Sequence, residues 1–349
     1  QASLCYKKLN MSKKNSNVSL KNQFKDIKEL NEVFLHFKNK LNKFKKKSFL
    51  VAVSGGPDSL ALAALSKAYE YQNKTKFFYV LINHNIRKGS LKEANQVKNL
   101  LKKNGVNLTI LSNKIKINNN IQAQARNIRY QMMSEFCKKN NIKIILTAHN
   151  LEDQVETFFI RLSRGSGLTG LSAMKNLTKL NNKLYLCRPF LNVKKKILIK
   201  ISNKTFGKYF KDPSNKNKNY LRKKIRGLKT PLKKSGINYD QIIKSINNLA
   251  SSKATLDIYF ADIYKNTTTK SKGKILVNLS KFNKLNNELK MHVINKSIKL
   301  LRKNYYNPRS KKVDNLIKHL KTKKFTKSTL AGCIFQKEQD NLSLKVEKR

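Results

Sequence analysis

The stretch FLVAVSGGPDSLALAALSKAYE, residues 49–70, decides the fold that this sequence predicts. It opens on a short, continuous apolar run, which is typical of a strand buried on both faces of a parallel sheet. Two glycines, a proline, an acid and a hydroxyl follow, and an Ala/Leu-rich segment then continues with a helical pattern. The stretch predicts a sharp turn from strand to helix, with Asp58 and Ser59 where the helix begins.

Strand and helix patterns alternate on either side of this turn. We expect further strands at 77–83, 106–111 and 142–148, and helices at 21–46, 90–105, 121–141 and 151–163. Strands separated by helices of this length favour βαβ units. The expected fold class is therefore α/β, with a doubly wound, mainly parallel sheet.

The rhythm changes after about residue 226. Helix-like segments flank a strand pattern at 274–282, and the final segment alternates apolar and polar residues around EQDN, as a hairpin does. We therefore predict a smaller α+β C-terminal domain at 227–349 after a first domain at 21–226. Residues 1–20 are expected to form a disordered polar tail, in which Met11 is a candidate start.

The chain carries 76 Lys and Arg against 19 Asp and Glu, a formal net charge of +57. This charge favours a polyanionic partner, RNA or DNA, with an affinity that falls steeply with salt. The abundance of Lys, Asn and Ile also indicates nucleotide bias in the coding sequence, which accounts for part of the excess.

The cysteines and the hydropathy exclude other classes of protein. The four cysteines are isolated and form no CxxC pair, which argues against a zinc framework or a disulfide scaffold. No apolar run is long enough to span a membrane, and the N-terminus lacks the apolar core of a secretion signal. We expect a cytoplasmic protein with reduced thiols and no membrane partner, and the oligomeric state, a homodimer included, stays open.

The turn SGGPDS, residues 54–59, is suited to a phosphate group. Backbone N–H groups of Gly55 and Gly56 can approach an anion closely, and a helix that begins here adds its positive end. Ser54 and Ser59 can donate hydroxyl hydrogen bonds, and Asp58 can hold Mg²⁺ against the phosphates. The alternative is a plain strand–helix turn that an Asp or Ser side chain caps.

A second block, TAHNLEDQVETFFIRLSRGSGLTGLSAM, covers residues 147–174. On a helix, His149, Asp153 and Glu156 would share one face, because they are spaced i, i+4 and i+7. That face would begin at the end of the fourth strand, at the same sheet edge as SGGPDS. The alternative is a polar face exposed to solvent, but acids are scarce in this chain and three of them cluster here.

The first block resembles the pyrophosphate-binding signature SGGxDS of the N-type ATP pyrophosphatases, the PP-loop family. The second resembles the HxxDDxxET…RGSGxxGL pattern of the tRNA(Ile)-lysidine synthetases, or lysidine synthases, with Glu152 in place of the first acid of the pair. Further segments are similar to motifs of that family in the same order: NHNIRKGS at 83–90, AQARNIRYQ at 123–131, CRPFLNVKK at 187–195 and KDPSNKNKNYLRKKIRGLKTPL at 211–232.

The resemblance implies an adenine nucleotide alpha hydrolase-like fold, ATP and Mg²⁺ as cofactors, and a particular reaction. ATP adenylates the C2 oxygen of the wobble cytidine in the CAU-anticodon tRNA(Ile). The ε-amine of L-lysine then displaces AMP, which gives lysidine.

The resemblance also assigns roles to residues. ATP binding falls to Ser54, Gly55, Gly56, Pro57, Asp58, Ser59 and His84, with Asp58 as the Mg²⁺ ligand. The catalytic set is Asp58, Arg126, His149, Asp153 and Glu156, of which Asp153 and Glu156 anchor lysine and Arg126 faces the departing pyrophosphate. Contacts to tRNA fall to Arg129, Arg164, Arg222 and Arg226, and the matched motif at 211–232 adds Asp212, Ser214 and Asn215.

Two other functions stay open on the sequence. A tRNA-thiolating PP-loop enzyme would share the first motif, but such enzymes usually need paired cysteines, and Cys137 and Cys187 are isolated. A non-catalytic RNA-binding protein would share the charge, but it would not need Asp58, Asp153 and Glu156 together.

Overall fold

The computed structural model describes residues 24–347 apart from 25, 45–47, 116, 118–120, 182, 211–220, 272, 303–307 and 323–324. The predicted tail and the motif residues Asp212, Ser214 and Asn215 lie outside the described residues. The chain forms two compact units, Gln1–Leu249 and Ala250–Arg349.

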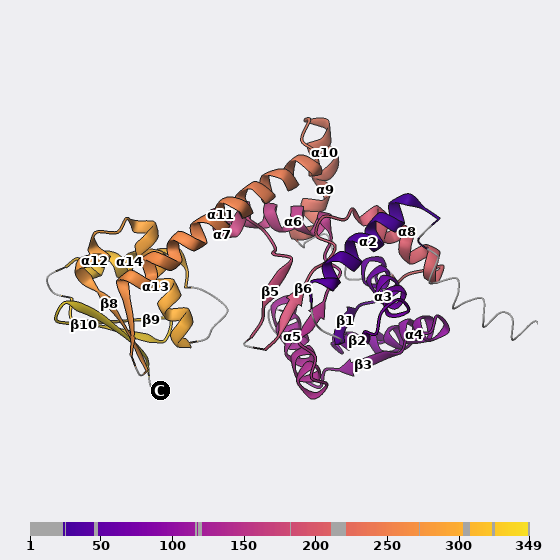
Figure 1. Cartoon of the computed structure of the whole chain (residues 1–349), viewed down its shortest axis with the longest axis horizontal. Helices are drawn as coiled ribbons and strands as arrows, with labels where there is room; N and C mark the ends of the chain where they lie inside the picture. The colour runs from indigo at the N-terminus through magenta and orange to yellow at the C-terminus, as the bar shows by residue number, and fades with distance from the viewer. Residues whose placement is uncertain are drawn as a thin grey trace, which may run out of the picture. The chain divides into compact units, whose positions relative to one another are not determined.

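Among the described residues of the first unit, six strands form one sheet in the order β3-β2-β1-β4-β6-β5 (Figure 1). The strands are β1 (Ser48–Val53), β2 (Lys76–Asn83), β3 (Leu108–Ser112), β4 (Ile144–Leu146), β5 (Leu177–Lys179) and β6 (Tyr185–Cys187). Neighbours pair in parallel, except that β5 runs antiparallel to β6 at the edge. The expected mainly parallel α/β sheet is confirmed, and β5 and β6 are strands that the pattern did not indicate.

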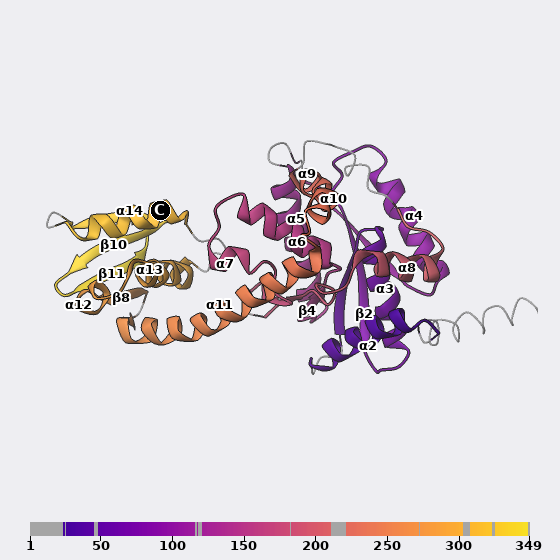
Figure 2. The ribbon, with the colours of Figure 1, turned by 90° about the horizontal axis from the view of Figure 1, so that it is seen from above.

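Helices cover both faces of this sheet, as Figures 1 and 2 show. Helices α2 (Lys28–Asn42), α3 (Pro57–Glu70), α4 (Ser90–Lys103) and α8 (Lys195–Phe206) lie on one face, and α5 (Ile121–Lys139) lies on the other. Helices α6 (Leu151–Leu162) and α7 (Leu168–Leu171) follow β4 in the chain. Successive side chains of β1 point to opposite faces. Phe49 and Val51 pack with α2, α3, α4 and α8, whereas Leu50 packs with Met133 and Cys137 of α5.

The strand order fixes where a ligand can bind. The chain moves from β1 outward to β2 and β3, then returns to place β4 on the other side of β1. Ligands of open parallel sheets bind at such a switch point, beyond the carboxyl ends of the strands. SGGPDS follows β1 and the acidic block follows β4, so both predicted motifs leave the sheet at the switch point.

The first unit extends further along the chain than the predicted boundary after residue 226. Helix α9 (Leu221–Gly227) lies across this boundary, and α10 (Lys229–Lys234) and α11 (Tyr239–Thr267) follow it. Ile242 and Ile246 of α11 are buried with Leu151 and Val155 of α6. This apolar contact holds residues 227–249 in the first unit, and the change of rhythm in the sequence did not reveal it.

The second unit has an antiparallel sheet of its own, in the order β7-β8-β11-β10-β9. Its elements are β7 (Thr268–Ser271), β8 (Lys274–Asn278), α12 (Leu279–Asn283), α13 (Asn287–Arg302), α14 (Ser310–Leu320), β9 (Lys327–Leu330), β10 (Cys333–Glu338) and β11 (Asn341–Val346). Glu338 pairs with Asn341 across the turn, which confirms the predicted hairpin. Helices α13 and α14 bury one face of the sheet through residues such as Val293 and Val313, so this unit is the expected α+β type.

Candidate active site

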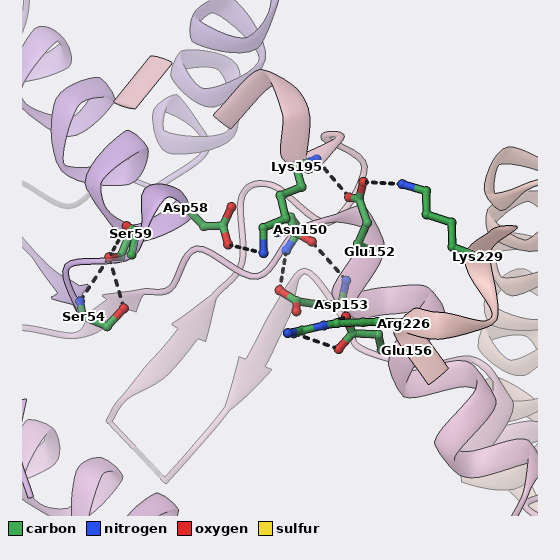
Figure 3. Close-up of polar contacts among 11 residues, drawn as sticks. Ser54, Asp58, Ser59, Asn150, Glu152, Asp153, Glu156, Lys195, Arg226 and Lys229 are labelled. Carbon is green, nitrogen blue, oxygen red and sulfur yellow. Dashed lines mark hydrogen bonds and ion pairs between the residues drawn. The ribbon is translucent and has the colours of Figure 1, made fainter. Parts of the chain in front are cut away.

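Two serines of the loop between β1 and α3 fix its conformation through hydrogen bonds. Ser59 Oγ accepts the backbone N–H of Ser54 at 3.1 Å and donates to the carbonyl of Gly56 at 3.0 Å, and Ser54 Oγ lies 3.2 Å from Ser59 Oγ (Figure 3). The N-cap of α3 is Gly56, without a side-chain cap, and Pro57 is the first helical residue. The capped-turn alternative does not hold, because the N-cap position carries no side chain. The first-turn N–H groups of α3 therefore lack a side-chain acceptor from the N-cap, as an anion site requires.

Gly55 is required by both its conformation and its surroundings. Its φ of +81° is one that L side chains rarely adopt. A Cβ at this position would also meet Val97 Cγ2 at 2.6 Å, and the carbonyl of Gly55 accepts the backbone N–H of Phe210 at 2.9 Å. Residue 55 is therefore fixed as glycine by the turn itself.

We expect Gly55→Ala to displace the loop from α4 and from Phe210. The free energy of unfolding should fall by about 1–3 kcal/mol, because a strained conformation and a clash add to each other. The affinity for ATP should fall at least tenfold, measured by isothermal titration. Gly207→Ala is a suitable control, since its φ is +71° but nothing lies near its added Cβ. Equal ATP affinity in the two variants would contradict this account of the loop.

Asp58 lies in the first turn of α3 with one carboxylate oxygen unsatisfied. Its side chain is 22% exposed, Oδ2 is 3.7 Å from Lys195 Nζ, and the buried Oδ1 has no hydrogen-bond partner among the described residues. Burial raises the pKa of Asp58 to about 6; Lys195 and the side chain of Asn150 oppose this rise, and the charges of Asp153 and Glu152 add to it. The carboxylate is thus held in a site with too little positive charge nearby.

These features fit a divalent cation. Among the described residues no group of three or more His, Cys, Asp and Glu side chains could hold a metal alone. Mg²⁺ commonly uses one or two carboxylates and completes its shell with water and substrate phosphates. An orphaned carboxylate oxygen beside an anion-binding loop is the arrangement that such an ion needs.

The acidic block begins with a capping box on α6. Asn150 is the N-cap: its side chain accepts the backbone N–H of Asp153 at 3.0 Å, and Asp153 Oδ2 accepts the backbone N–H of Asn150 at 3.1 Å. His149 precedes the cap and is not on the helix, so the predicted shared helical face of His149, Asp153 and Glu156 is wrong. A capping box needs Asn150 in extended backbone, so the helix begins at Leu151, two residues after His149.

His149 is nevertheless part of the same cluster. Its Nδ1 lies 3.0 Å from the hydroxyl of Thr147. Burial lowers the pKa of His149 to about 4; Asp153 opposes this shift, and Arg188, Arg126 and Arg222 lower the pKa further. The imidazole is therefore neutral near pH 7, and three arginines from separate segments lie close enough to act on it.

Glu156 is paired with Arg226 rather than left open. Arg226 donates from Nε to Oε1 at 2.5 Å and from Nη2 to Oε2 at 3.2 Å, a two-pronged contact that Figure 3 shows. The side chain of Glu156 is 3% exposed and that of Arg226 is 43% exposed. Burial raises the pKa of Glu156, although Arg226 opposes the rise. The pair ties α9 to α6.

The neighbouring acid, Glu152, also contacts two lysines from distant segments of the chain. Its Oε2 accepts the backbone N–H of Lys195 at 2.9 Å, and its Oε1 lies 3.7 Å from Lys229 Nζ. Lys195 thus contacts Glu152 through its backbone and Asp58 through its ammonium group (Figure 3). One residue of α8 links the phosphate loop to the acidic block.

Comparisons with known proteins identify the family. A family profile described as a PP-loop domain matches residues 29–231. A tRNA(Ile)-lysidine synthase of Wolbachia pipientis wMel is 32% identical over 318 residues, which cover 89% of this chain and 74% of the relative. One of Rickettsia felis is 31% identical over 309 residues, 87% of this chain and 70% of the relative.

The chain belongs to the tRNA(Ile)-lysidine synthase family. It is an enzyme: an ATP-binding ligase of the PP-loop kind that acts in tRNA modification. Among solved structures, the U34-tRNA thiolase NcsA from Methanococcus maripaludis, with its [4Fe-4S] cluster, has a TM-score of 0.55 at 16% identity. The match covers 63% of this chain and 78% of that one, and it concerns the fold alone. In the part of the chain that the structure describes, every helix is too short or too polar to cross a bilayer.

Three other predicted residues have no hydrogen bond or ion pair to this cluster among the described residues of this lysidine synthase. Arg126 is exposed on α5, with its guanidinium 5.0 Å from the ring centre of Tyr130, and its charge acts on His149. Both ring nitrogens of His84 are buried and have no hydrogen-bond partner among the described residues. Burial, and then the charge of Arg129, lowers the pKa of His84 to about 4. Arg164 is exposed just after α6.

Sequence reasoning missed three residues that complete the site. Asn150 could have been found, because Asn-x-x-Asp before an apolar helix is a capping-box signal. Lys195 and Arg188 lie in the matched segment 187–195 but carried no assigned role. Arg188 is 5% exposed and donates to the carbonyl of Lys175 and to Thr178. Only the fold brings Lys195 to Asp58, so no local pattern could have indicated it.

Proposed function

We propose that this enzyme ligates L-lysine to C2 of the wobble cytidine in a CAU-anticodon tRNA(Ile), and that it uses ATP through an adenylated base. The observation that supports this most is the meeting of Asp58 with Asp153 and Glu152. Their charges raise the pKa of Asp58, so the phosphate loop and the acidic block lie within electrostatic reach of one another. A nucleotide tail and an amino-acid cation would therefore occupy adjoining sites.

In the first step, the C2 oxygen of cytidine attacks the α-phosphorus of ATP, and the bond to the β-phosphate breaks. The backbone N–H groups of the loop and the N-terminus of α3 would bind the phosphates. Mg²⁺ held by Asp58 would neutralise charge on the departing pyrophosphate. Lys195 and Arg126 are the side-chain cations that we assign to the same oxygens, Lys195 because it already lies at Asp58.

In the second step, the ε-amine of lysine attacks C2, AMP leaves with the former C2 oxygen, and the amine loses a proton. Asp153 is the first candidate to hold the ammonium group, because the capping box uses Oδ2 and leaves Oδ1 without a partner among the described residues. Glu156 adds negative charge, but Arg226 holds both of its oxygens. Asp153, Glu156 and the neutral His149 are the candidates for the proton acceptor.

The tRNA would meet the site through cations. Anticodon bases are unstacked and can be turned into a pocket. The charge of Arg222 acts on His149 and Glu156, and we assign this arginine to the phosphates around the cytidine. We assign Arg129, Arg164 and the Lys-rich second unit to the remainder of the tRNA. Arg226 has its guanidinium on Glu156, so its contact with tRNA is limited to the exposed edge.

Thiolation fits the observations less well. Cys137 and Cys187 are buried, and burial raises their pKa to about 12 and about 11. Both would remain protonated thiols near pH 7, which are poor nucleophiles and poor sulfur carriers.

The product decides between these functions. The full chain is incubated with ATP, Mg²⁺, L-lysine and a tRNA(Ile) transcript that carries the CAU anticodon, and the digested tRNA is analysed by mass spectrometry. We expect lysidine in place of cytidine, and no modified nucleoside in a matched transcript with a GAU anticodon. An unchanged cytidine or a thiolated base would overturn the proposal.

A further inference from the structure

Three acids of the candidate active site are paired with cations of the chain itself, as Figure 3 shows. The pairs are Asp58 with Lys195, Glu152 with Lys229, and Glu156 with Arg226. Two of these cations, Arg226 and Lys229, come from the consecutive helices α9 and α10. In the proposed reaction the acidic block binds the ammonium group of lysine, so these two side chains hold a place that a substrate has to take.

The guanidinium group of Arg226 acts on more than the acid that it contacts. It holds both carboxylate oxygens of Glu156, at 2.5 Å and 3.2 Å. These hydrogen bonds raise the pKa of Arg226; burial opposes the rise, and the charges of Glu156, Asp153 and Asp58 add to it. An ammonium group bound at Asp153 would therefore be within electrostatic reach of Arg226, and like charges at short range repel each other. While Arg226 stays on Glu156, the affinity for lysine should be low.

Helices α9 and α10 bury little apolar surface against the site. Within residues 221–234, all of which the structure describes, Ile225 alone is buried. The side chains of Arg226 and Lys229 are 43% and 59% exposed, so each has an edge open to solvent. A segment with few buried apolar contacts opens at a low cost in free energy. The two ion pairs are therefore a large part of what holds this segment, and a competing anion can replace them.

The composition of the same segment indicates which anion competes. Residues 221–234 contain seven Lys and Arg among fourteen residues and no acid, against 76 Lys and Arg among the 349 residues of the chain. Lys and Arg side chains are the usual contacts of a nucleic-acid backbone. The phosphates of ATP share this chemistry, but the loop at 54–59 and Lys195 serve them in the proposed reaction. The exposed edges of Arg226 and Lys229 favour the tRNA.

Lysine can offset the cost of moving Arg226. The side chain of Glu156 is 3% exposed, and a buried carboxylate that loses its only cation strongly destabilises a fold. An ammonium group that arrives as the guanidinium leaves keeps this carboxylate paired. Binding of lysine and binding of tRNA should then favour each other, and linkage requires that each raises the affinity for the other by the same factor.

We propose that Arg226 and Lys229 occupy the lysine site of the free enzyme, and that tRNA phosphates withdraw them, so that lysine binds tightly only when the tRNA is in place. This inference rests on the proposed function, because it takes lysine and tRNA as the two substrates. It adds an order of binding that the proposed reaction does not require.

Equilibrium dialysis of radiolabelled L-lysine against the full chain tests this order. The affinity is measured without other ligands, then with Mg²⁺ and α,β-methylene-ATP, and then with CAU-anticodon tRNA(Ile) as well. The methylene bridge prevents cleavage between the α- and β-phosphates, so no turnover occurs. We expect the tRNA to raise the affinity for lysine roughly fivefold or more, the lower end of usual couplings. If the ATP analogue alone gives the whole rise, the assignment to tRNA is overturned.

Variants of α9 identify the side chain responsible. Without tRNA, Arg226→Ala should bind lysine at least fivefold more tightly than wild type, and tRNA should then add less than twofold. Arg226→Lys keeps the positive charge and should keep most of the effect of tRNA. Lys224→Ala is the matched control, because Lys224 is exposed on the same helix. Weaker lysine binding by Arg226→Ala would mean that Arg226 binds the carboxylate of the substrate, and would overturn the proposal.

A milder variant keeps the test decisive if Arg226→Ala does not fold. Lys229 is 59% exposed, so Lys229→Ala should leave the fold intact and raise the tRNA-free affinity for lysine in the same direction. A value equal to that of Lys224→Ala would then overturn the proposal.

The lysidine assay separates this inference from the proposed function. A chain that makes no lysidine, yet binds lysine more tightly with tRNA, would refute the proposed function alone. Lysidine formation with an affinity for lysine that tRNA does not change would refute this inference alone. A chain that makes no lysidine and binds no lysine in any of the mixtures would refute both.

Discussion

Asp58→Asn should abolish most of the activity and make the protein more stable. The variant keeps the shape of the side chain but removes the charge that would hold Mg²⁺, so the rate of AMP formation should fall roughly a thousandfold. At the same time it removes a carboxylate whose charged form is destabilised by burial and by Asp153 and Glu152. A gain of stability together with a loss of activity would show that the charge of Asp58 serves the reaction and destabilises the fold.

The raised pKa of Asp58 determines how the stability of the folded chain changes with pH. The pKa of Asp58 is about 6 in the folded chain and 3.8 in a model peptide. A raised folded pKa means that the stability is greatest below the unfolded value and is lost as pH rises through about 6. Because one pKa unit equals about 1.4 kcal/mol, the charged carboxylate lowers the free energy of unfolding by up to about 3 kcal/mol at pH 7.

Thermal melts from pH 4 to pH 8 test this directly. Without ligand, Asp58→Asn should melt several degrees above wild type at pH 7.5, and the difference should shrink as pH falls from about 6 towards 4. With Mg²⁺ and ATP the order should reverse, since only the wild type binds the complex tightly. Asp240→Asn is the matched control, because Asp240 is 59% exposed and pairs with Lys194. A variant that melts like this control at every pH would show that Asp58 is not a strained carboxylate.

The second large effect is expected at the pair of Glu156 and Arg226. Arg226→Ala leaves a carboxylate that is 3% exposed without its partner, so the free energy of unfolding of the first unit should fall by about 2–3 kcal/mol. This loss is at or below the lower end of the roughly 3–5 kcal/mol that removing one partner of a buried ion pair usually costs. The reason is that Arg226 is 43% exposed, so water can enter the space that it leaves. Helix α9 should then loosen from α6, and lysidine formation should slow.

A double-mutant cycle separates the pair from other effects. Glu156→Gln alone should lower the free energy of unfolding less than Arg226→Ala does, because Arg226 can turn to solvent. The double variant should recover part of the loss, with a coupling energy of about 1–3 kcal/mol in urea unfolding. Lys224→Ala provides the control, since Lys224 is exposed on the same helix. If Arg226→Ala matches it in stability and only KM for tRNA rises, Arg226 acts on the tRNA and not on Glu156.

Local chemistry made much of the fold predictable. The apolar run at 49–53 indicates a buried strand, the glycines indicate a tight turn, and the Ala/Leu-rich segment indicates a helix. The structure contains all three. The switch point follows from the same alternation, since a parallel sheet built from βαβ units must reverse its direction of growth somewhere. Strands β5 and β6 contribute three residues each, and neither lies in an apolar run as long as the segment 142–148 that indicated the equally short β4.

The candidate site was less accessible to the sequence, because its charges are paired over long separations. Glu156 and Arg226, or Asp58 and Lys195, meet only once the sheet is formed. The regular spacing of His149, Asp153 and Glu156 suggested one helical face, yet Asn150 begins the helix after His149. Spacing alone carries no information on where a helix starts, whereas the capping residue does.

Release of AMP, with each substrate omitted in turn, tests the central claim most directly. If the phosphate loop and the acidic block serve one two-step reaction, AMP forms only when ATP, Mg²⁺, CAU-anticodon tRNA(Ile) and lysine are all present. Pyrophosphate without lysine should then appear in at most one equivalent per tRNA. AMP release at the same rate without lysine or without tRNA would contradict the account, because the two halves of the site would then not act on a shared base.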